Sequence, residues 1–312
     1  MNLIFIIIFI ISLLLLILGI ICGISEKKNT SFQESFYTLS SEKLATKLRI
    51  VDIADLHQRA FGKDNADLIT AIAALKPDLI ILDGDLINRK KTDFAFLSSL
   101  CGKLTKIAPV YAGLGNHENA VIYGSDLNRL FLESQEAKLT GNRWDLSPLV
   151  LDERILKSME EAGVVVLQNE CCLIEAGGSR INIAGTSCNA SSYEKYTKYF
   201  IKECFEKEDP SVFRLLICHR PEVVTMYMAD EPIDLILSGH VHGGIVVLPY
   251  IGAVFGANGE FFPKYTGGLY EIGRTKLLLS RGFEGKQLVP RINNKPELVV
   301  LDIGPAETQS TK

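Results

Sequence analysis

Hydrophobic positions follow one pattern at the N-terminus and another beyond residue 48. Residues 3–24 form an apolar run of Ile, Leu and Phe, interrupted only by one serine, two glycines and one cysteine. A helix of this length crosses the roughly 30 Å hydrocarbon core of a bilayer. A cleaved signal peptide fits less well, because no basic residue precedes the run and it exceeds the ~7–15 residues of a signal-peptide core. We therefore expect a single-pass transmembrane anchor over residues 1–24.

The segment after the apolar run is polar and shows no strong period. Residues 25–47 are therefore expected to form a linker that carries the folded domain away from the bilayer. Lys27 and Lys28 follow the run and no basic residue precedes it. The positive-inside rule then favours the cytoplasmic side of the membrane for the body of the protein.

Beyond residue 48, short apolar runs alternate with segments whose apolar residues recur at helical spacing. A short, wholly apolar run suits a buried strand, and apolar residues three and four apart indicate an amphipathic helix. We expect strands at 48–53, 78–82, 110–114 and 164–167, and helices at 64–76, 92–106 and 152–163. This alternation is typical of an α/β core.

Strand-like runs dominate the second half of the chain. We expect a hairpin at 172–184 that turns at Gly177-Gly178, and strands at 212–218, 234–237, 268–272, 276–280 and 298–303. Together these elements predict one α/β domain over residues 48–304, with two sheets and helices outside them, followed by a tail at 305–312. The pattern weakens at 120–151, which indicates either a surface insertion or a lid over a binding site.

The composition fits a globular enzyme with an added apolar segment. The chain has 312 residues, of which 47% are hydrophobic and 22% are charged. Its net charge of −4 argues against a nucleic-acid partner, because such proteins usually carry a basic surface. The seven cysteines show neither a disulfide framework nor the paired spacing of a zinc site.

Polar residues able to bind metal follow directly after the predicted strands. Ligands gather beyond the carboxyl ends of strands in α/β sheets, so these side chains are expected to converge. In an extended segment, residues i and i+2 point to the same side, so His240 and His242 should reach toward one point. The set includes all five histidines of the chain and comprises Asp55, His57, Asp85, Asn116, His117, His219, His240 and His242.

Carboxylate, carboxamide and imidazole groups together make a mixed nitrogen and oxygen ligand set. Such a set suits Mn, Fe, Zn or Co better than Ca or Mg, which prefer oxygen ligands alone. The set is too large for one ion. Two ions about 3.5–4 Å apart would use it fully, and such a pair promotes phosphoryl displacement by activating a bound water and stabilising the leaving oxygen.

The polar motifs resemble, in their order along the chain, those of the calcineurin-like metallophosphoesterase superfamily. They read Asp55-x-His57, Gly84-Asp85, Gly115-Asn116-His117-Glu118, His219 and Gly239-His240-x-His242. The membrane-associated bacterial branch is similar to the chain at Gly243-Gly244, Pro263-Lys264-Tyr265, Gly268-Leu269-Tyr270, Ser280-Arg281-Gly282 and Pro296-Glu297-Leu298. The resemblance implies a four-layer α/β/β/α sandwich.

The resemblance also implies a role for each residue of the set. One metal ion would be held by Asp55, His57, Asp85 and His242, and the other by Asp85, Asn116, His219 and His240, so that Asp85 bridges them. His117 would not be a ligand; it would face the phosphate and protonate or stabilise the leaving oxygen. The chain departs from the family pattern at Ile245, Ala54 and Glu118 without losing a ligand.

Three arginines are candidates for binding the substrate phosphate, because the guanidinium group matches phosphate oxygens; they are Arg220, Arg281 and Arg291. A solvated surface position is the alternative for each. We therefore expect a membrane-anchored phosphoesterase with two divalent ions, Mn²⁺ first among them. It would hydrolyse a monoester, diester or pyrophosphate through an activated water, and the anchor favours a lipid-linked substrate. The alternatives are a non-catalytic membrane-tethered metal-binding scaffold and a metal-dependent nuclease.

Overall fold

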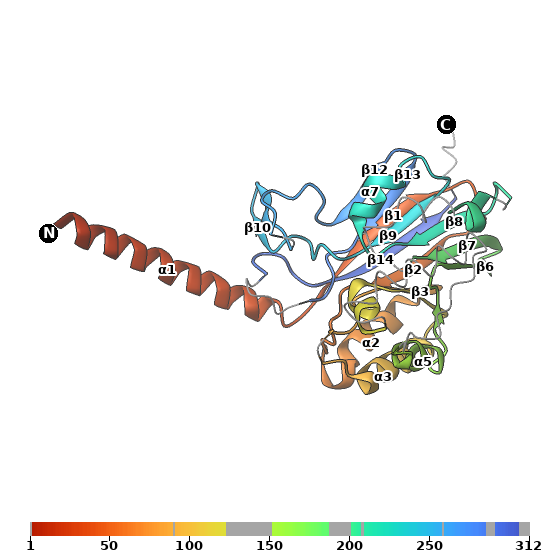
Figure 1. Cartoon of the computed structure of the whole chain (residues 1–312), viewed down its shortest axis with the longest axis horizontal. Coiled ribbons are helices and arrows are strands. Elements are labelled where there is room, and N and C mark those ends of the chain that lie inside the picture. Colours follow the sequence, from red (N-terminus) through yellow and green to blue (C-terminus); the bar gives the residue numbers. More distant parts are fainter. Residues whose placement is uncertain are drawn as a thin grey trace, which may run out of the picture.

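The computed structural model describes residues 2–89, 91–122, 152–186, 201–206, 209–257, 259–284 and 291–305. Two six-stranded sheets lie face to face, and helices cover their outer sides (Figure 1). The expected insertion at 120–151 lies outside the described residues beyond position 122, as does the tail beyond 305. The interpretation of 120–151 as a lid therefore stays a prediction.

The first sheet is parallel except where its second strand runs against its third. In spatial order it contains β1 (Gln33–Ser40), β14 (Glu297–Gly304), β2 (Leu48–Ile53), β3 (Leu79–Asp83), β4 (Val110–Gly113) and β5 (Val165–Val166). Its outer face packs against α2 (Ala66–Leu75), α3 (Phe94–Leu104) and α5 (Arg154–Glu160).

The second sheet has four parallel strands flanked by one antiparallel strand at each edge. In spatial order it contains β12 (Gly268–Ile272), β13 (Thr275–Leu279), β9 (Leu235–Ser238), β8 (Phe213–Ile217), β7 (Ser179–Gly185) and β6 (Glu170–Ala176). Its outer face packs against α7 (Pro221–Tyr227) and a π-helical turn, Lys202–Glu206. A separate hairpin pairs β10 (Val246–Leu248) with β11 (Gly252–Phe255).

Alternate residues of the central strands contribute to different hydrophobic cores, because successive side chains point to opposite faces of a sheet. On β2, Val51 and Ile53 pack with α2, α3 and α5, whereas Ile50 packs between the sheets. On β8, Leu215 packs between the sheets and Leu216 packs with α7. The cores therefore separate four layers in the order helix, sheet, sheet, helix, which confirms the predicted α/β/β/α sandwich.

The expected strands and helices are present, with ends displaced by a few residues. Among the described residues, β1, α7, the β10–β11 hairpin and the π-helical turn Lys202–Glu206 were not predicted. β1 corrects the interpretation of 25–47 as a linker, since Gln33–Ser40 pairs in parallel with β14 along its whole length. The segment resembles a linker because β1 is an edge strand, whose residues alternate between half-buried and exposed without an apolar run.

Residues Asn2–Lys28 form one helix, α1, which projects from the sandwich (Figure 1). Leu3–Lys28 is long enough and apolar enough to cross a membrane, and its most apolar stretch is wholly exposed. Only four residues separate α1 from β1. The helix is therefore joined to the edge of the first sheet with almost no intervening chain.

Candidate metal centre

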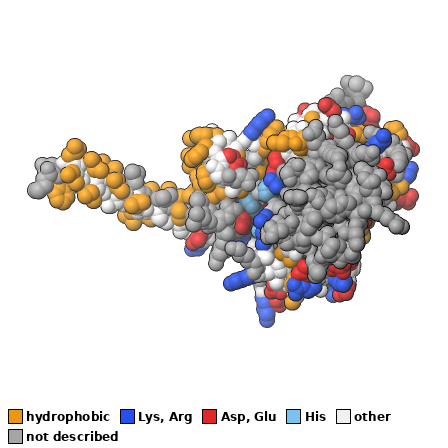
Figure 2. All heavy atoms as spheres, viewed as in Figure 1, with side chains coloured by type: hydrophobic (Ala, Val, Ile, Leu, Met, Phe, Trp, Pro, Cys, Tyr) orange, Lys and Arg blue, Asp and Glu red, His pale blue; other side chains and the backbone are white. Residues whose placement is uncertain are grey.

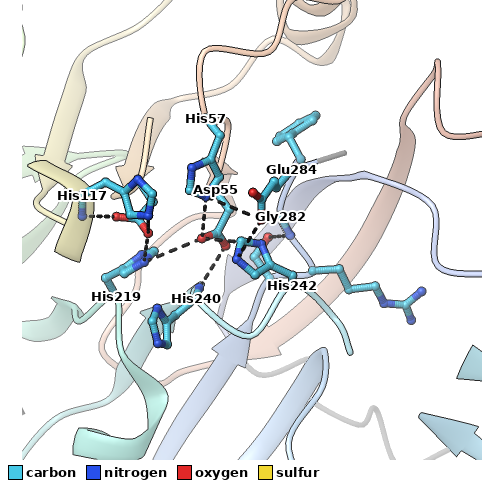
Figure 3. Close-up of polar contacts among 12 residues, drawn as sticks. Asp55, His57, His117, His219, His240, His242, Gly282 and Glu284 are labelled. Atoms are coloured by element: carbon cyan, nitrogen blue, oxygen red, sulfur yellow. Dashed lines mark hydrogen bonds and ion pairs between the residues drawn. The ribbon is translucent and has the colours of Figure 1, made fainter. Parts of the chain in front are cut away.

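The predicted metal-binding residues converge at one end of the sandwich, where strands of both sheets finish. Asp55 and His57 follow β2, Asp85 follows β3, and His219 follows β8. Because β2 and β3 run parallel, as do β8 and β9, their carboxyl ends meet at the same side of each sheet. In Figure 3, Asp55 lies in the middle of the cluster, with histidines from both sheets around it.

The backbone of this region turns sharply instead of remaining extended. Asp55, His57 and Asp85 have φ angles of 53°, 49° and 50°, and His240 and His242 have φ angles of 70° and 51°. This left-handed region is uncommon for residues with a side chain and costs of the order of 1–3 kcal/mol each. The expectation that an extended backbone aims both histidines at one point is therefore wrong: the rings of His240 and His242 lie on different sides of Asp55 (Figure 3).

One group of donor atoms contains Asp55, His57 and His242, whose ligand atoms lie within 4.8 Å of one another. Asp55 Oδ1 lies 3.9 Å from His57 Nε2 and 3.9 Å from His242 Nδ1. Glu284 Oε2 lies 3.2 Å from His242 Nε2 and 3.9 Å from His57 Nε2. Glu284 was missed in the sequence, although it stands shortly after β13, in the same kind of strand-end position as the predicted residues.

A second group contains Asp85, His219 and His240, again within 4.8 Å. His219 Nε2 lies 3.2 Å from Asp85 Oδ2, and its Nδ1 makes a 2.6 Å hydrogen bond with the backbone oxygen of Asp83. This bond leaves Nε2 to face the centre, as a metal-binding histidine requires. The two groups are contiguous, because His219 Nε2 also lies 3.7 Å from Asp55 Oδ1.

His117 forms a third group with His57 and Asp85 and is less enclosed than the other members. Its Nε2 lies 3.9 Å from Asp85 Oδ2, and its side chain is 25% exposed. Its backbone N–H donates to Asp85 Oδ1 at 2.7 Å. The ring of His117 therefore stands at the open side of the centre, next to the carboxylate of Asp85.

Unsatisfied polar atoms line the centre, as expected for residues that hold a cation. Asp55 Oδ1, Asn116 Oδ1 and His219 Nε2 are buried and have no hydrogen-bond partner among the described residues, and the same holds for both ring nitrogens of His57. Burying a polar group without a partner is unfavourable. A divalent cation that accepts both nitrogen and oxygen ligands fits this donor set.

Burial disfavours the charged forms of the side chains in the centre, and neighbouring charged groups shift their pKa values further. Although burial lowers the pKa of His219, the carboxylates of Asp85 and Asp55 raise it well above its usual value. Burial would raise the pKa of Asp85, but the neighbouring histidines, His219 first among them, together outweigh that effect and hold it far below its usual range. Burial also raises the pKa of Asp55 to about 6. A divalent cation at this place would oppose protonation of His219, because a metal-binding imidazole must be neutral.

Glu118, which departs from the family pattern, is buried behind the centre. Its Oε2 accepts hydrogen bonds from the backbone N–H groups of Asp85 at 2.8 Å and Gly115 at 3.0 Å. Its Oε1 accepts from the N–H of Leu86 at 2.8 Å. One carboxylate therefore ties together the turns that follow β3 and β4.

The three arginines occupy different surroundings. Arg291 is fully buried, and its guanidinium group donates to backbone oxygens of residues 281, 282, 284 and 294, so the structure contradicts its expected role as a phosphate ligand. Arg220 is paired with Glu222, whose Oε1 lies 3.8 Å from His240 Nε2. Arg281 is partly exposed, with its Nε 3.9 Å from Glu297. Glu222, at the start of α7, was also missed in the sequence.

A cavity of about 550 Å³ opens beside His57 and Glu284 and reaches the end of α1. The remaining lining residues are Glu26, Asn29, Thr30, Leu56, Arg59 and Asn88. The end of α1 is fixed in place, because Asn29 Nδ2 donates to the backbone oxygen of Arg291 at 2.9 Å and Arg59 donates to the backbone oxygen of Asn29. One cavity therefore extends from the metal centre to the base of the apolar helix.

Comparison with known proteins agrees with this geometry. The calcineurin-like phosphoesterase family matches residues 48–244. The chain is 27% identical to phosphodiesterase YaeI of Escherichia coli, over 83% of each chain. It is 26% identical to the uncharacterized metallophosphoesterase YkuE of Bacillus subtilis, over 82% of this chain and 78% of the relative. It is also 25% identical to UDP-2,3-diacylglucosamine pyrophosphatase LpxG of Chlamydia trachomatis, over 65% and 66%.

Proposed function

Because the chain belongs to the calcineurin-like phosphoesterase family, it is a metal-dependent phosphoric ester hydrolase, and we propose that it holds two divalent ions side by side. The observation that carries this proposal is the contiguity of the two donor groups. The Asp55/His57/His242 group and the Asp85/His219/His240 group meet where His219 lies near both carboxylates. Asp85 has one oxygen beside His219 and is the natural bridge.

We assign the ligands in two sets that share Asp85. The first ion would be held by Asp55, His57, Asp85 and His242, with Glu284 within reach of the same histidines. The second ion would be held by Asp85, Asn116, His219 and His240. The mixture of nitrogen and oxygen donors favours Mn²⁺, with Fe, Zn and Co as alternatives.

Two such cations would supply Lewis acidity to the phosphoryl oxygens and would lower the pKa of the attacking water. His117 contributes from the open side of the centre. Burial lowers its pKa to about 4, so its imidazole is neutral near pH 7. A neutral ring still carries one N–H, and this favours a hydrogen bond to the leaving oxygen over transfer of a proton from a cationic ring.

The position of the cavity supports a substrate at the membrane surface. Glu26, Asn29 and Thr30, at the base of α1, form one wall, and His57 and Glu284 form the metal side. With α1 as a transmembrane anchor, the cavity lies at the depth of lipid head groups. The name of the relative LpxG specifies a diacylated substrate cleaved at a pyrophosphate. We therefore propose a lipid-linked phosphate or pyrophosphate as the substrate.

The first test is hydrolysis of a chromogenic phosphodiester and a chromogenic monoester by the full chain in detergent, with Mn²⁺ and after chelation. We expect activity that chelation abolishes and that Asp85→Asn reduces to background. His117→Ala should keep its bound metal and lose roughly 10²-fold or more in rate, the usual cost of removing one positioned hydrogen-bond donor. Glu153→Gln, at an exposed carboxylate paired with Lys157, is the matched control and should retain full activity.

The same assay separates the alternatives. Full activity in Asp85→Asn would refute the bridging ligand, and full activity in His117→Ala would refute its role at the leaving group. Two bound metals with no hydrolysis of either ester would direct the assay to a diacylated pyrophosphate substrate. A chain that binds metal and hydrolyses none of these substrates, the diacylated pyrophosphate included, would support the scaffold interpretation, and cleavage of DNA in preference to both esters would support a nuclease.

A further inference from the structure

Large apolar side chains are exposed on the two loops next to the β10–β11 hairpin. Tyr250 is fully exposed, and Ile251, Phe261 and Phe262 are 64%, 76% and 68% exposed. Leu248, at the end of β10, is exposed as well. We call these five residues the apolar tip. Exposed apolar residues gathered in one place mark a surface that contacts a partner or a membrane.

The apolar tip is held in a defined shape. Tyr250 and Phe262 adopt φ angles of 66° and 51°, which side chains rarely tolerate. The N–H of Phe262 donates to Val254 O at 3.1 Å, and the ring of Phe261 packs edge-on against Phe255 with centroids 5.6 Å apart. The backbone thus presents these aromatic groups to the outside even though their burial would be favourable.

The tip lies on the side of the molecule from which α1 emerges. In Figure 1 the hairpin projects beside the base of α1, and in Figure 2 its orange apolar surface borders pale blue histidine atoms. Residues 291–292 connect the two: Arg291 O accepts from the Asn29 side chain, next to α1, and Ile292 O accepts from the N–H of Val247 in β10. The hairpin and the base of α1 are therefore neighbours.

We propose that the apolar tip is a second membrane contact, which inserts into the head-group region of the bilayer that α1 crosses. The tip continues the apolar surface of α1 on the same side of the protein, and this continuity favours a bilayer over a soluble partner. Aromatic residues prefer the membrane interface, and a basic residue stands next to them at Lys264, whose ammonium lies 5.0 Å from the centre of the Tyr265 ring.

A second contact would set the orientation of the metal centre. With one helix alone the domain could tilt relative to the bilayer, whereas a second contact beside the base of α1 would restrict which face meets the lipid. Only three residues separate His242 from β10, so the tip is coupled to the ligands through a very short segment. The inference depends on α1 being a membrane anchor and does not depend on the reaction catalysed.

Fluorescence quenching in lipid vesicles tests this contact in the full chain. The sole tryptophan is first replaced by Trp144→Phe, and Tyr250→Trp is then introduced into that background. Vesicles of phosphatidylcholine and phosphatidylglycerol are prepared with and without bromine on the acyl chains near the head group. The matched control is Leu173→Trp, at a 43% exposed position on β6, at the end of the sandwich far from α1 (Figure 1).

We expect brominated lipid to quench the indole of Tyr250→Trp at least twofold more than the indole of Leu173→Trp. A repeat with Phe262→Trp guards against a local effect of one substitution, and both tip positions should respond alike. Equal quenching at the tip and at β6, in protein that floats with the vesicles, would overturn the inference and leave the tip to a protein partner. Protein that does not float would overturn both the anchor and the second contact, while the ester assay above still decides the catalytic proposal.

Discussion

Asp52 is buried between the two sheets, three residues before Asp55 and outside the donor groups. Burial, with added repulsion from Asp55 and Glu297, raises the pKa of Asp52 to about 8. An aspartate in an unfolded chain has a pKa of about 3.9. Between these values the folded protein holds a proton that the unfolded chain releases, so the stability contributed by Asp52 is present at low pH and is lost as the pH rises toward 8.

Asp52→Asn should therefore stabilise the metal-free protein increasingly as the pH rises. The amide keeps the shape of the carboxyl group and cannot ionise. The difference in unfolding free energy between variant and wild type should grow from pH 5 to pH 8, by at most ~1.4 kcal/mol per pH unit. Urea unfolding of the full chain, in the presence of a chelator and at pH 5, 6, 7 and 8, measures this difference. A difference that stays constant over this range would show that the carboxyl group is already ionised at pH 5.

The sequence predicted the convergence of individual side chains better than their orientation. Aspartates placed directly after apolar strands, as at Asp55 and Asp85, could be recognised because the ends of parallel strands in one sheet share an edge. The left-handed backbone at His240 and His242 could not, since it arises from contacts between loops of the two sheets. Arg291 was misjudged because its residue type gave no sign that it is buried, with its guanidinium group donating to backbone oxygens between residues 281 and 294.

The turns after β3 and β4 depend on the buried carboxylate of Glu118 more than on contacts of their own. Glu118→Gln would replace one acceptor oxygen by an amide donor and leave either the N–H groups of Asp85 and Gly115 or that of Leu86 without a partner. An unsatisfied buried N–H costs ~1–3 kcal/mol, so we expect a loss of stability of that size and weaker metal binding. Urea unfolding and metal titration measure the two effects. Glu34→Gln, on the exposed side of β1, is the control, and equal losses in both variants would contradict the assigned role.

At the level of elements, buried strands were predictable and edge elements were not. β3 and β8 are buried on both faces; β3 is apolar up to its final aspartate, and β8 is apolar apart from Arg214. β1 has only one half-buried face and pairs with a strand more than 250 residues away, so its local sequence carries little signal. α7 is seven residues long, too short for its periodicity to stand out.

For the whole molecule, the metal ions should contribute to stability as well as to chemistry. A ligand that binds only the folded state at a concentration 100 times its Kd stabilises that state by ~2.7 kcal/mol. For a domain of this size that corresponds to a decrease in Tm of roughly 5–10 °C on chelation. Differential scanning fluorimetry of the full chain with Mn²⁺ and with chelator measures this decrease. Asp85→Asn should show a smaller decrease, and an unchanged wild-type Tm would indicate that the site binds metal weakly or not at all.

Because only four residues connect α1 to β1, the position of the anchor would restrict which phosphate groups can reach the metal centre. β1 is hydrogen-bonded to β14 along its length, and Asn29 is fixed to Arg291, so this connection has little freedom to stretch. With α1 in the bilayer, this short connection would fix the distance between the metal centre and the hydrocarbon boundary. Substrate selectivity would then depend partly on how far a phosphate group lies from the hydrocarbon boundary. A phosphate at the height of the metal centre would be within reach, and the same phosphate on a longer or shorter carrier would not.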